Sequence, residues 1–170
     1  MLSLTIESAH LQLVQMSPDD VDSLAHGRGV AALQSAGDDA LPPRHAAAHA
    51  HSLWASGVAP RWCLPYLVID HDKGVAVGTC RFKGAPVEGR VEIGYGVATA
   101  ARRGGVATVA VRRLVALAIA SEAVREVVAL ILPGNAASVG VVAKAGFTER
   151  GTRIDHDGEI VLQWVLDLRE

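Results

Sequence analysis

A glycine-rich segment with two arginines is the part of this sequence best suited to hold a charged ligand. It reads RRGGVA over residues 102–107, between an alternating pattern typical of a strand and an apolar pattern typical of a long helix. A helix start offers free amide N–H groups, glycines let a ligand approach the backbone, and arginines add positive charge. The segment predicts a pocket for phosphate oxygens, and a strand-to-helix turn that only needs glycine is the alternative. It matches neither a Walker loop nor a dinucleotide-binding fingerprint.

Glu92 is the carboxylate best placed to act as a base. Side chains alternate along a strand, so in the predicted strand 90–97 Glu92 shares one face with Gly94 and Gly96. That face carries a carboxylate beside bare backbone, where a reacting group can come close. A carboxylate in such a place can accept a proton. The alternative is a solvated or ion-paired strand residue.

The elements that must position these residues follow from hydrophobic periodicity and capping signals. Residues 1–10 alternate as a strand does, through Leu2, Leu4 and Ile6. We expect helices over 17–27, 43–55, 106–121 and 136–145, and strands over 10–15, 62–69, 75–82, 90–97, 127–132, 148–155 and 159–168. The order β-α-α-β-β-β-α-β-α-β-β predicts a mixed α/β fold.

Length and composition exclude several classes of protein. The chain has 170 residues, of which 50% are hydrophobic and 20% charged, with a net charge of −2. These values predict one folded domain over residues 1–170 and disfavour nucleic-acid binding through overall positive charge. The longest apolar runs, 114–120 and 127–132, are too short to cross a bilayer, and the N-terminus does not resemble a secretory signal. We therefore expect a cytoplasmic protein with no nucleic-acid or membrane partner.

Histidines and cysteines offer little sign of a metal or a disulfide. His45 and His49 are four residues apart on a predicted helix, and His51 follows, but no third ligand matches them. We expect no metal site and interpret this helix as a solvated or substrate-facing surface. Cys63 and Cys80 fit reduced thiols, with a disulfide between them as the alternative.

Three motifs follow one another along the chain. The loop reads R-x-x-G-x-A, E-I-G-Y precedes it, and N-x-x-S followed by K-A-G-F comes after it. The residues are Arg102, Gly105 and Ala107; Glu92–Tyr95; Asn135 and Ser138; and Lys144–Phe147. In this order the motifs resemble the GNAT N-acetyltransferase superfamily, whose acyl-coenzyme A site has the first pattern, and within it the RimJ/RimL-like branch. The motifs cover residues 91–147, with weaker similarity outside them.

The resemblance implies a twisted mixed sheet of about seven strands, flanked by about four helices, whose fourth and fifth strands (90–97 and 127–132) splay apart. It implies acetyl-coenzyme A as co-substrate. Backbone amides from Arg103 to Thr108 would hold the pyrophosphate, Arg102 would lie nearest the phosphates, and main chain at Val97 and Ala98 would pair with the pantetheine. The expected cofactor-binding residues are Val97, Ala98, Arg102, Arg103, Gly104, Gly105, Val106, Ala107, Thr108 and Asn135.

The resemblance also implies direct transfer of the acetyl group to an amine in a ternary complex. Glu92 would act as base, and the N–H near Val97 would stabilise the oxyanion. Many relatives protonate the leaving thiolate with a tyrosine where this chain has Val142. Ser138 is the substitute we expect, although it can equally be a helix-start residue.

The sequence does not decide whether the acceptor is a small-molecule amine or a protein N-terminus. It also does not decide whether the protein is a monomer or a homodimer. Asp38, Asp39 and the helix histidines are candidates to meet a cationic amine. The main alternative function is a non-catalytic domain of the same fold that binds or senses acyl-coenzyme A, which the missing tyrosine favours.

Overall fold

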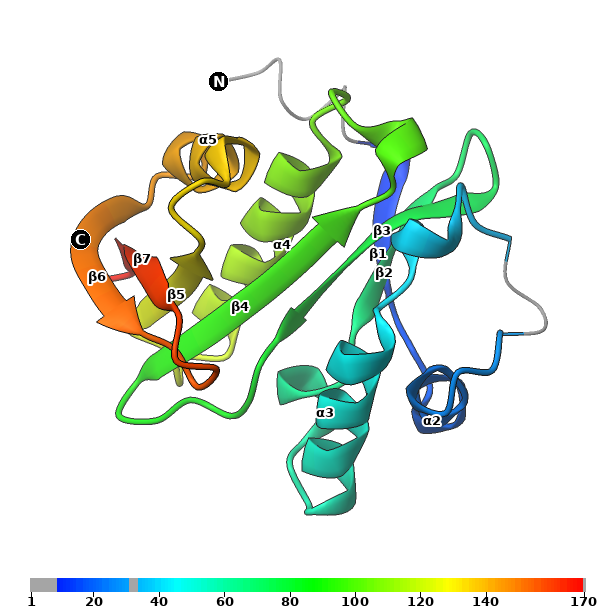
Figure 1. Ribbon diagram of the computed structural model, residues 1–170, viewed down its shortest axis with the longest axis horizontal. Coiled ribbons are helices and arrows are strands. Elements are labelled where there is room, and N and C mark those ends of the chain that lie inside the picture. The colour runs from blue at the N-terminus through cyan, green and yellow to red at the C-terminus, as the bar shows by residue number, and fades with distance from the viewer. Residues whose placement is uncertain (1–8, 31–33, 170) are drawn as a thin grey trace.

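The central feature of the computed structural model, which describes residues 9–30 and 34–169, is a seven-stranded sheet. Its spatial order is β1-β2-β3-β4-β5-β7-β6 (Figure 1). The strands are β1 Leu11–Gln15, β2 Tyr66–Asp70, β3 Val75–Phe82, β4 Arg90–Val97, β5 Glu126–Ile131, β6 Thr148–Ile154 and β7 Ile160–Asp167. The alternating stretch over residues 1–8 lies outside the described residues. The predicted order of elements is confirmed.

The middle of the sheet opens between β4 and β5. These two strands are parallel and pair only from Arg90–Ile93 to Glu126–Ala129. Beyond that point, residues 94–97 of β4 remain paired with β3 alone, while β5 continues against β7. The expected splay of the fourth and fifth strands is therefore confirmed, and it leaves one edge of β4 without a neighbouring strand.

Helices cover both faces of the sheet. The described residues form α2 Pro18–Ala25, α3 Arg44–Ala55, α4 Val106–Ala120 and α5 Ala136–Lys144, with short 3₁₀ turns η1 Asp38–Ala40, η2 Pro60–Trp62 and η3 Thr99–Ala101. Figure 1 shows α4 and α5 on one side of the molecule and α2 and α3 on the other. No helix among the described residues is long and apolar enough to cross a membrane.

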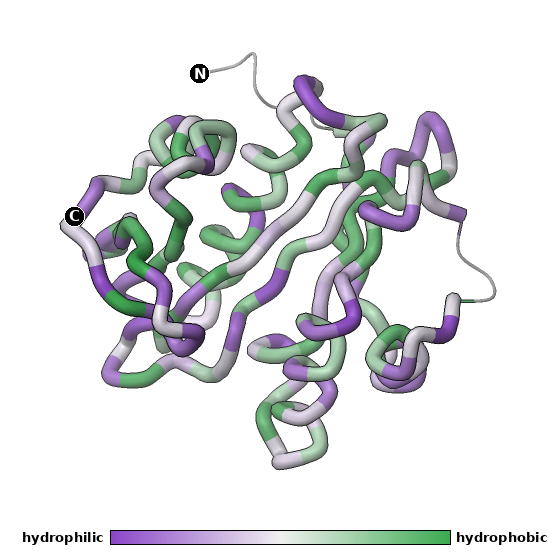
Figure 2. The backbone as a smooth tube through the Cα atoms, in the orientation of Figure 1, coloured by the Kyte–Doolittle hydropathy of each residue, from purple (hydrophilic) through white to green (hydrophobic). Residues whose placement is uncertain are grey.

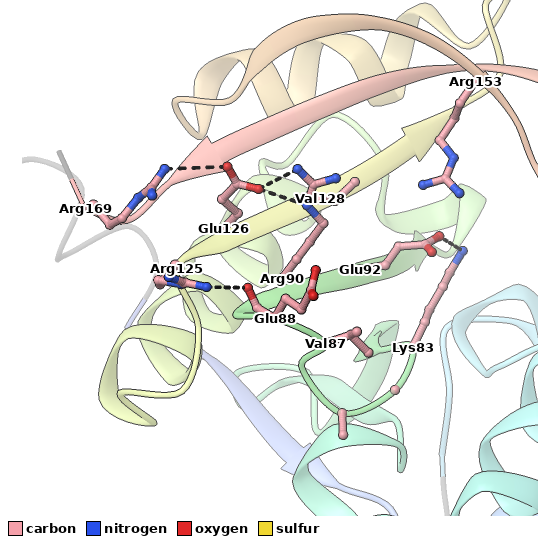
Figure 3. A pocket seen from close by; sticks show the side chains of 12 residues that line it. Lys83, Val87, Glu88, Arg90, Glu92, Arg125, Glu126, Val128, Arg153 and Arg169 are labelled. Carbon is pink, nitrogen blue, oxygen red and sulfur yellow. Dashed lines mark hydrogen bonds and ion pairs between the residues drawn. The ribbon is translucent and has the colours of Figure 1, made fainter.

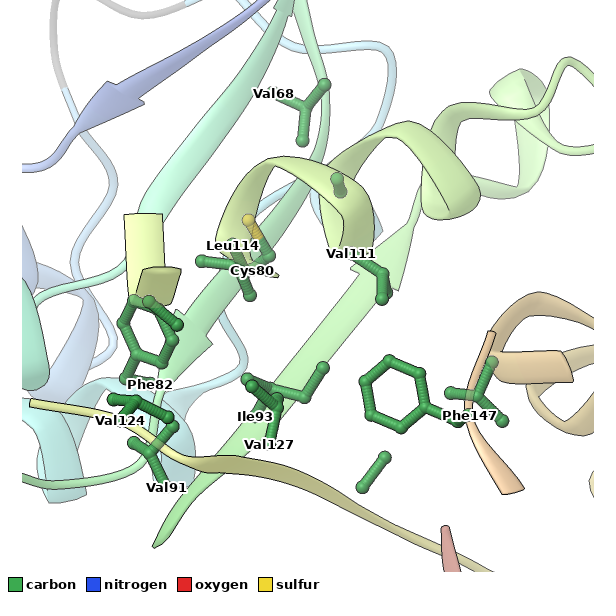
Figure 4. Packing of buried hydrophobic residues seen from close by; sticks show 14 of the residues in the cluster. Val68, Cys80, Phe82, Val91, Ile93, Val111, Leu114, Val124, Val127 and Phe147 are labelled. Carbon is green, nitrogen blue, oxygen red and sulfur yellow. The ribbon is translucent and has the colours of Figure 1, made fainter. Parts of the chain in front are cut away.

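Two apolar clusters hold these layers together. The larger one packs α4, through Val111 and Leu114, against inward residues of the sheet such as Ile93 and Val127 (Figure 4). The smaller one joins α2 and α3 to the opposite face of β2 and includes Leu67. Figure 2 shows the same division, with hydrophobic residues along β5 and α4 and hydrophilic ones in most connecting loops. Because α4 is fixed along its length, its N-terminus is held at the splayed end of β4.

The strand expected from Trp62 starts later than predicted. Residues 60–62 form a 3₁₀ turn opened by Pro60, and regular pairing begins at Tyr66. Pro65 has no N–H to donate to a ladder, which delays the strand. Trp62 instead packs edge-on against Phe82, with 4.9 Å between ring centroids. The apolar side chains that suggested a strand are used for core packing.

Candidate active site

The N-terminus of α4 is bare. Its first flanking residue, Gly105, has a left-handed backbone (φ 75°), Arg103 shares that conformation (φ 68°), and no side chain caps the helix. The first helical bond runs from the Val109 N–H to the Gly105 carbonyl at 3.1 Å. The amides of residues 106–108 therefore have no hydrogen-bond partner within the described part of the chain. Such unpartnered amides at the positive end of a helix dipole favour an anion.

A cleft of about 570 Å³ lies beside this helix start. It extends from the 102–108 loop to the splayed end of β4 and the first turns of α5. Of the residues expected at the cofactor and at the reaction centre, it brings together Val97, Arg102, Arg103, Gly105, Val106, Ala107, Thr108, Asn135 and Ser138. The loop, the helix start and the open strand edge thus form one continuous surface.

Ala98 and Gly104 do not line this cleft. Ala98 is fully buried, its N–H donates to the Val77 carbonyl at 2.9 Å, and its own carbonyl accepts from the Ala101 N–H at 2.8 Å. The Ala98 N–H is therefore engaged, and its carbonyl, which accepts one hydrogen bond, is the group left to pair with a pantetheine chain. The sequence does not show which backbone groups bond within the fold.

Asn135 caps α5, and Ser138 lies on its first turn. The Asn135 side-chain oxygen accepts a hydrogen bond from the Ser138 N–H at 3.1 Å, which satisfies an amide at the helix start. The Ser138 hydroxyl makes no hydrogen bond with the described residues and faces the cleft. The Asn135 cap thus helps to fix the position of Ser138 at the start of α5.

Tyr95 also lines this cleft, although no role was expected for it from the sequence. Its hydroxyl donates to the Ser138 carbonyl at 3.3 Å, and burial raises the pKa of Tyr95 above its ordinary value. Val142, where relatives carry a tyrosine, is fully buried in the core. Tyr95 lies two residues beyond Ile93, the last β4 residue paired with β5, so only the splay of these strands reveals its place in the cleft. A phenol therefore reaches the cleft from β4 and not from α5.

Glu92 lies in a second cleft of about 800 Å³ (Figure 3). Its Oε1 is 2.9 Å from the Lys83 ammonium, and about a third of each side chain is exposed. The Lys83 stem covers Gly94, where a Cβ atom would lie 2.9 Å from Lys83 Cε. β4 borders both clefts, with Glu92 in one and residues 95–97 in the other. β4 thus carries the predicted base in one cleft and reaches the cleft of the predicted cofactor loop with its last residues.

A family model described as an acetyltransferase (GNAT) domain matches residues 10–148. The chain belongs to the GNAT acetyltransferase family. Solved structures share its fold at low sequence identity. One is an aminoglycoside acetyltransferase in complex with coenzyme A, with a TM-score of 0.67, 19% identity, and coverage of 94% of this chain and 95% of that chain.

Two further neighbours of this GNAT domain act, by their names, on other amines. A ribosomal-protein-S5-alanine acetyltransferase from Vibrio fischeri has a TM-score of 0.65 and 16% identity, and covers 93% of each chain. A chimeric spermidine N-acetyltransferase from Vibrio cholerae and hSSAT has a TM-score of 0.66 and 13% identity, and covers 93% of this chain and 94% of that one. A search of curated proteins finds no match.

The histidines of α3 are separated in this GNAT domain. The Arg81 guanidinium lies 3.1 Å from His49 Nδ1, whereas His51 lies 3.7 Å from an Asp22 oxygen and His45 is exposed. Burial first, and then the Arg81 charge, lowers the pKa of His49. Within the described ranges no three His, Cys, Asp or Glu side chains are grouped to hold a metal.

Asp39 is used to fix the chain just before the cofactor loop. Its Oδ2 accepts from the Thr99 N–H at 2.8 Å and from the Thr99 hydroxyl at 2.7 Å. These bonds lower the pKa of Asp39. The carboxylate expected to meet an amine acceptor is therefore already engaged, and it ties η1 to η3.

Asp39→Asn is expected to lower the melting temperature at neutral pH but not in acid. A carboxylate whose pKa is depressed by folding stabilises the fold above its unfolded pKa of about 4, and that stabilisation is lost as the pH falls through the folded pKa. Thermal melts between about pH 3 and 7 measure the difference. Asp38→Asn is the matched control, since the Asp38 carboxylate bonds no described residue. An equal difference at every pH would contradict the assignment.

Both cysteines are free and buried. Burial raises the pKa of Cys80 to about 12 and also raises that of Cys63. A thiol is a nucleophile only as its thiolate, so neither sulfur is prepared to attack. The disulfide considered for this pair is absent, and neither residue lines one of the two clefts described above.

Proposed function

We propose that this GNAT domain is an acetyl-coenzyme A-dependent N-acetyltransferase of the RimJ/RimL-like branch. The observation that carries the proposal is the bare N-terminus of α4 opening into a cleft that runs to the splayed edge of β4. A pyrophosphate needs several hydrogen-bond donors that converge on it and little side-chain bulk where it approaches. The three unpartnered amides supply such donors, and Arg102 and Arg103 add positive charge. The unpaired edge of residues 94–97 suits an extended amide-containing chain such as pantetheine.

The residues of this site can complete an acyl transfer with balanced protons. Glu92 accepts the proton that the amine loses as its nitrogen bonds to the thioester carbonyl carbon. The N–H near Val97 stabilises the oxyanion, a contribution of roughly 2.7–4 kcal/mol in comparable sites. The carbon–sulfur bond then breaks, and the leaving thiolate accepts a proton from a hydroxyl group that lines the cleft. Glu92 Oε1 faces Lys83, so Oε2 is the oxygen left for the amine.

Tyr95 is the proton donor that we favour over Ser138 for the departing thiolate. Burial keeps its hydroxyl protonated through neutral and mildly alkaline pH, and the bond to α5 holds it at the cleft. A coenzyme A thiolate leaves readily, so the expected contribution is at the low end of the range for a general acid.

Tyr95→Phe is expected to reduce kcat about 10- to 100-fold while leaving the Kd for coenzyme A within about twofold. Ser138→Ala is the matched comparison, because Tyr95 bonds the Ser138 backbone carbonyl and that bond survives the change. Steady-state rates across pH and calorimetric binding separate the two effects. If Ser138→Ala slows turnover and Tyr95→Phe does not, Ser138 is the donor.

Direct transfer is favoured over an acyl-enzyme. Cys63 and Cys80 are the thiols of the chain, and burial holds both as thiols away from the clefts. Reduced, buried cysteines also fit a cytoplasmic protein. The acceptor is an amine, either a small molecule or a protein N-terminus.

A domain that binds acyl-coenzyme A without turnover is the second candidate, because Val142 stands where the family resemblance implies a tyrosine. Release of thiol from acetyl-coenzyme A, measured with a panel of small amines and N-terminal peptides, distinguishes the two. Turnover that depends on an amine supports the transferase. Tight cofactor binding without turnover on any amine, unchanged by Glu92→Gln, would establish the binding domain instead.

A further inference from the structure

The cleft that holds Glu92 carries more positive than negative charge. Five cationic side chains line it against three carboxylates. The cations are Lys83, Arg90, Arg125, Arg153 and Arg169, and the carboxylates are Glu88, Glu92 and Glu126. An acceptor that enters this cleft meets a positive field, which repels polycations and attracts anions.

At the outer end of the cleft, contacts within the protein hold each cation. Arg90 lies 2.7 Å from a carboxylate oxygen of Glu126, and Arg169 lies 2.6 Å from Asp167 and 3.7 Å from Glu126. Arg125 donates to the Glu88 carbonyl at 2.7 Å. These arginines are fixed in the wall of the cleft, so the cations left for a ligand lie at the other end, near Glu92.

Arg153 is the cation at this end of the cleft whose guanidinium has no partner among the described residues. It comes from β6, and its side chain makes no hydrogen bond or ion pair with residues 9–30 or 34–169. Figure 3 shows its guanidinium pointing into the cleft, over Glu92 and Lys83. A guanidinium offers several N–H donors in a planar fork that matches a carboxylate or phosphate.

Arg81 adds a buried positive charge behind this point. It is 8% exposed, its Nη2 lies 3.1 Å from His49, and its Nη1 has no partner. His49 does not offset the charge, because burial, Arg81, Lys83 and His156 all lower its pKa and favour the neutral ring. Glu92 is the carboxylate that interacts with the Arg81 charge, and Lys83 already pairs with it. The single negative charge of Glu92 therefore balances only one of the two positive charges of Lys83 and Arg81.

We propose that the acceptor is an amine that also carries a carboxylate or phosphate, and that its anionic oxygens bind between Arg153 and Lys83. This inference rests on the proposed acetyltransferase function and adds the chemical class of its acceptor. The anion offsets the surplus charge and holds the amine beside Glu92. The Lys83 ammonium has further N–H donors for the anion while it stays paired with Glu92 Oε1, which leaves Oε2 to accept the amine proton.

The test compares kcat/KM for matched acceptors that differ in the anion. Phosphoethanolamine is paired with ethanolamine, β-alanine with its amide, and spermidine serves as the polycation. The expected result is at least a tenfold preference for the anionic member of one pair, which also identifies carboxylate or phosphate as the group bound. Added NaCl should weaken the preference because salt screens the attraction.

Arg153→Gln is expected to reduce that preference at least tenfold. Arg150→Gln is the matched control, since Arg150 is an exposed arginine of the same strand that does not line the cleft. As a second readout, inorganic phosphate should compete with the acceptor in the wild-type protein and not in Arg153→Gln.

Two outcomes overturn this inference while leaving the proposed function intact. One is turnover of neutral or cationic amines as fast as of their anionic counterparts. The other is an anion preference that Arg153→Gln does not change. Failure of the function itself looks different, because then no amine of any charge releases thiol from a protein that binds acetyl-coenzyme A.

Discussion

Gly105→Glu should raise the Kd for acetyl-coenzyme A at least about 100-fold, which corresponds to about 2.7 kcal/mol. Gly105 has φ 75°, a conformation that costs a residue with a side chain roughly 1–2 kcal/mol. The glutamate also brings a negative charge to the bare amides of α4, where the pyrophosphate is expected. Calorimetric titration with coenzyme A measures the change.

Gly104→Ala is the control for this effect. Gly104 lies next to Gly105 but has no positive φ and does not line the cleft, and a Cβ there meets the Ala101 carbonyl at an ordinary 3.7 Å. We expect its Kd within about threefold of the wild type. Gly105→Ala separates backbone strain from charge, since it carries the strain alone. Unchanged binding in Gly105→Glu would remove the helix start from the cofactor site.

Glu92→Gln should reduce kcat about 10²- to 10⁴-fold without weakening coenzyme A binding. Glutamine keeps the shape of the side chain but cannot take a proton at neutral pH. Because Glu92 and the bare helix start lie in different clefts, removal of the base affects the chemical step and leaves the cofactor site unchanged. Steady-state rates at saturating acceptor, across pH, provide the measurement, and the loss should be smallest at high pH where the amine is already neutral.

Glu88→Gln is the matched control, because the Glu88 carboxylate lines the same cleft and bonds no described residue. It should leave kcat within about twofold. Equal losses in Glu92→Gln and Glu88→Gln would mean that the cleft needs negative charge and not a base. A loss in Glu92→Gln that Lys83→Gln reverses would identify the ion pair, rather than proton transfer, as the cause.

β4 is the element on which both clefts depend. It pairs with β5 over its first half and separates from it afterwards, so its unpaired edge faces the cleft at the start of α4 while Glu92 lies in the other cleft. In this arrangement one strand carries the proposed base, the proposed oxyanion donor and an open backbone edge. Gly94 is part of it, because the Lys83 stem lies where a side chain would be.

The sequence by itself determined the features that arise from neighbours along the chain. Alternation in 90–97 placed Glu92, Gly94 and Gly96 on one face, and the apolar spacing after Gly105 placed the start of α4. The motifs around residues 102–107 and 135–147 indicated the family and therefore the splay of the strands. Such signals are local, so periodicity and capping reveal them without a model of the fold.

Only the tertiary structure decided which side chains and backbone groups meet across the sheet. It paired Glu92 with Lys83, engaged Asp39 with Thr99, engaged the Ala98 N–H with Val77, and brought Tyr95 to the first turn of α5. It also placed Arg153 over a cleft whose other residues are far away in sequence. These contacts depend on strand register and on how β4 and β5 separate, and neither leaves a periodic trace in the sequence.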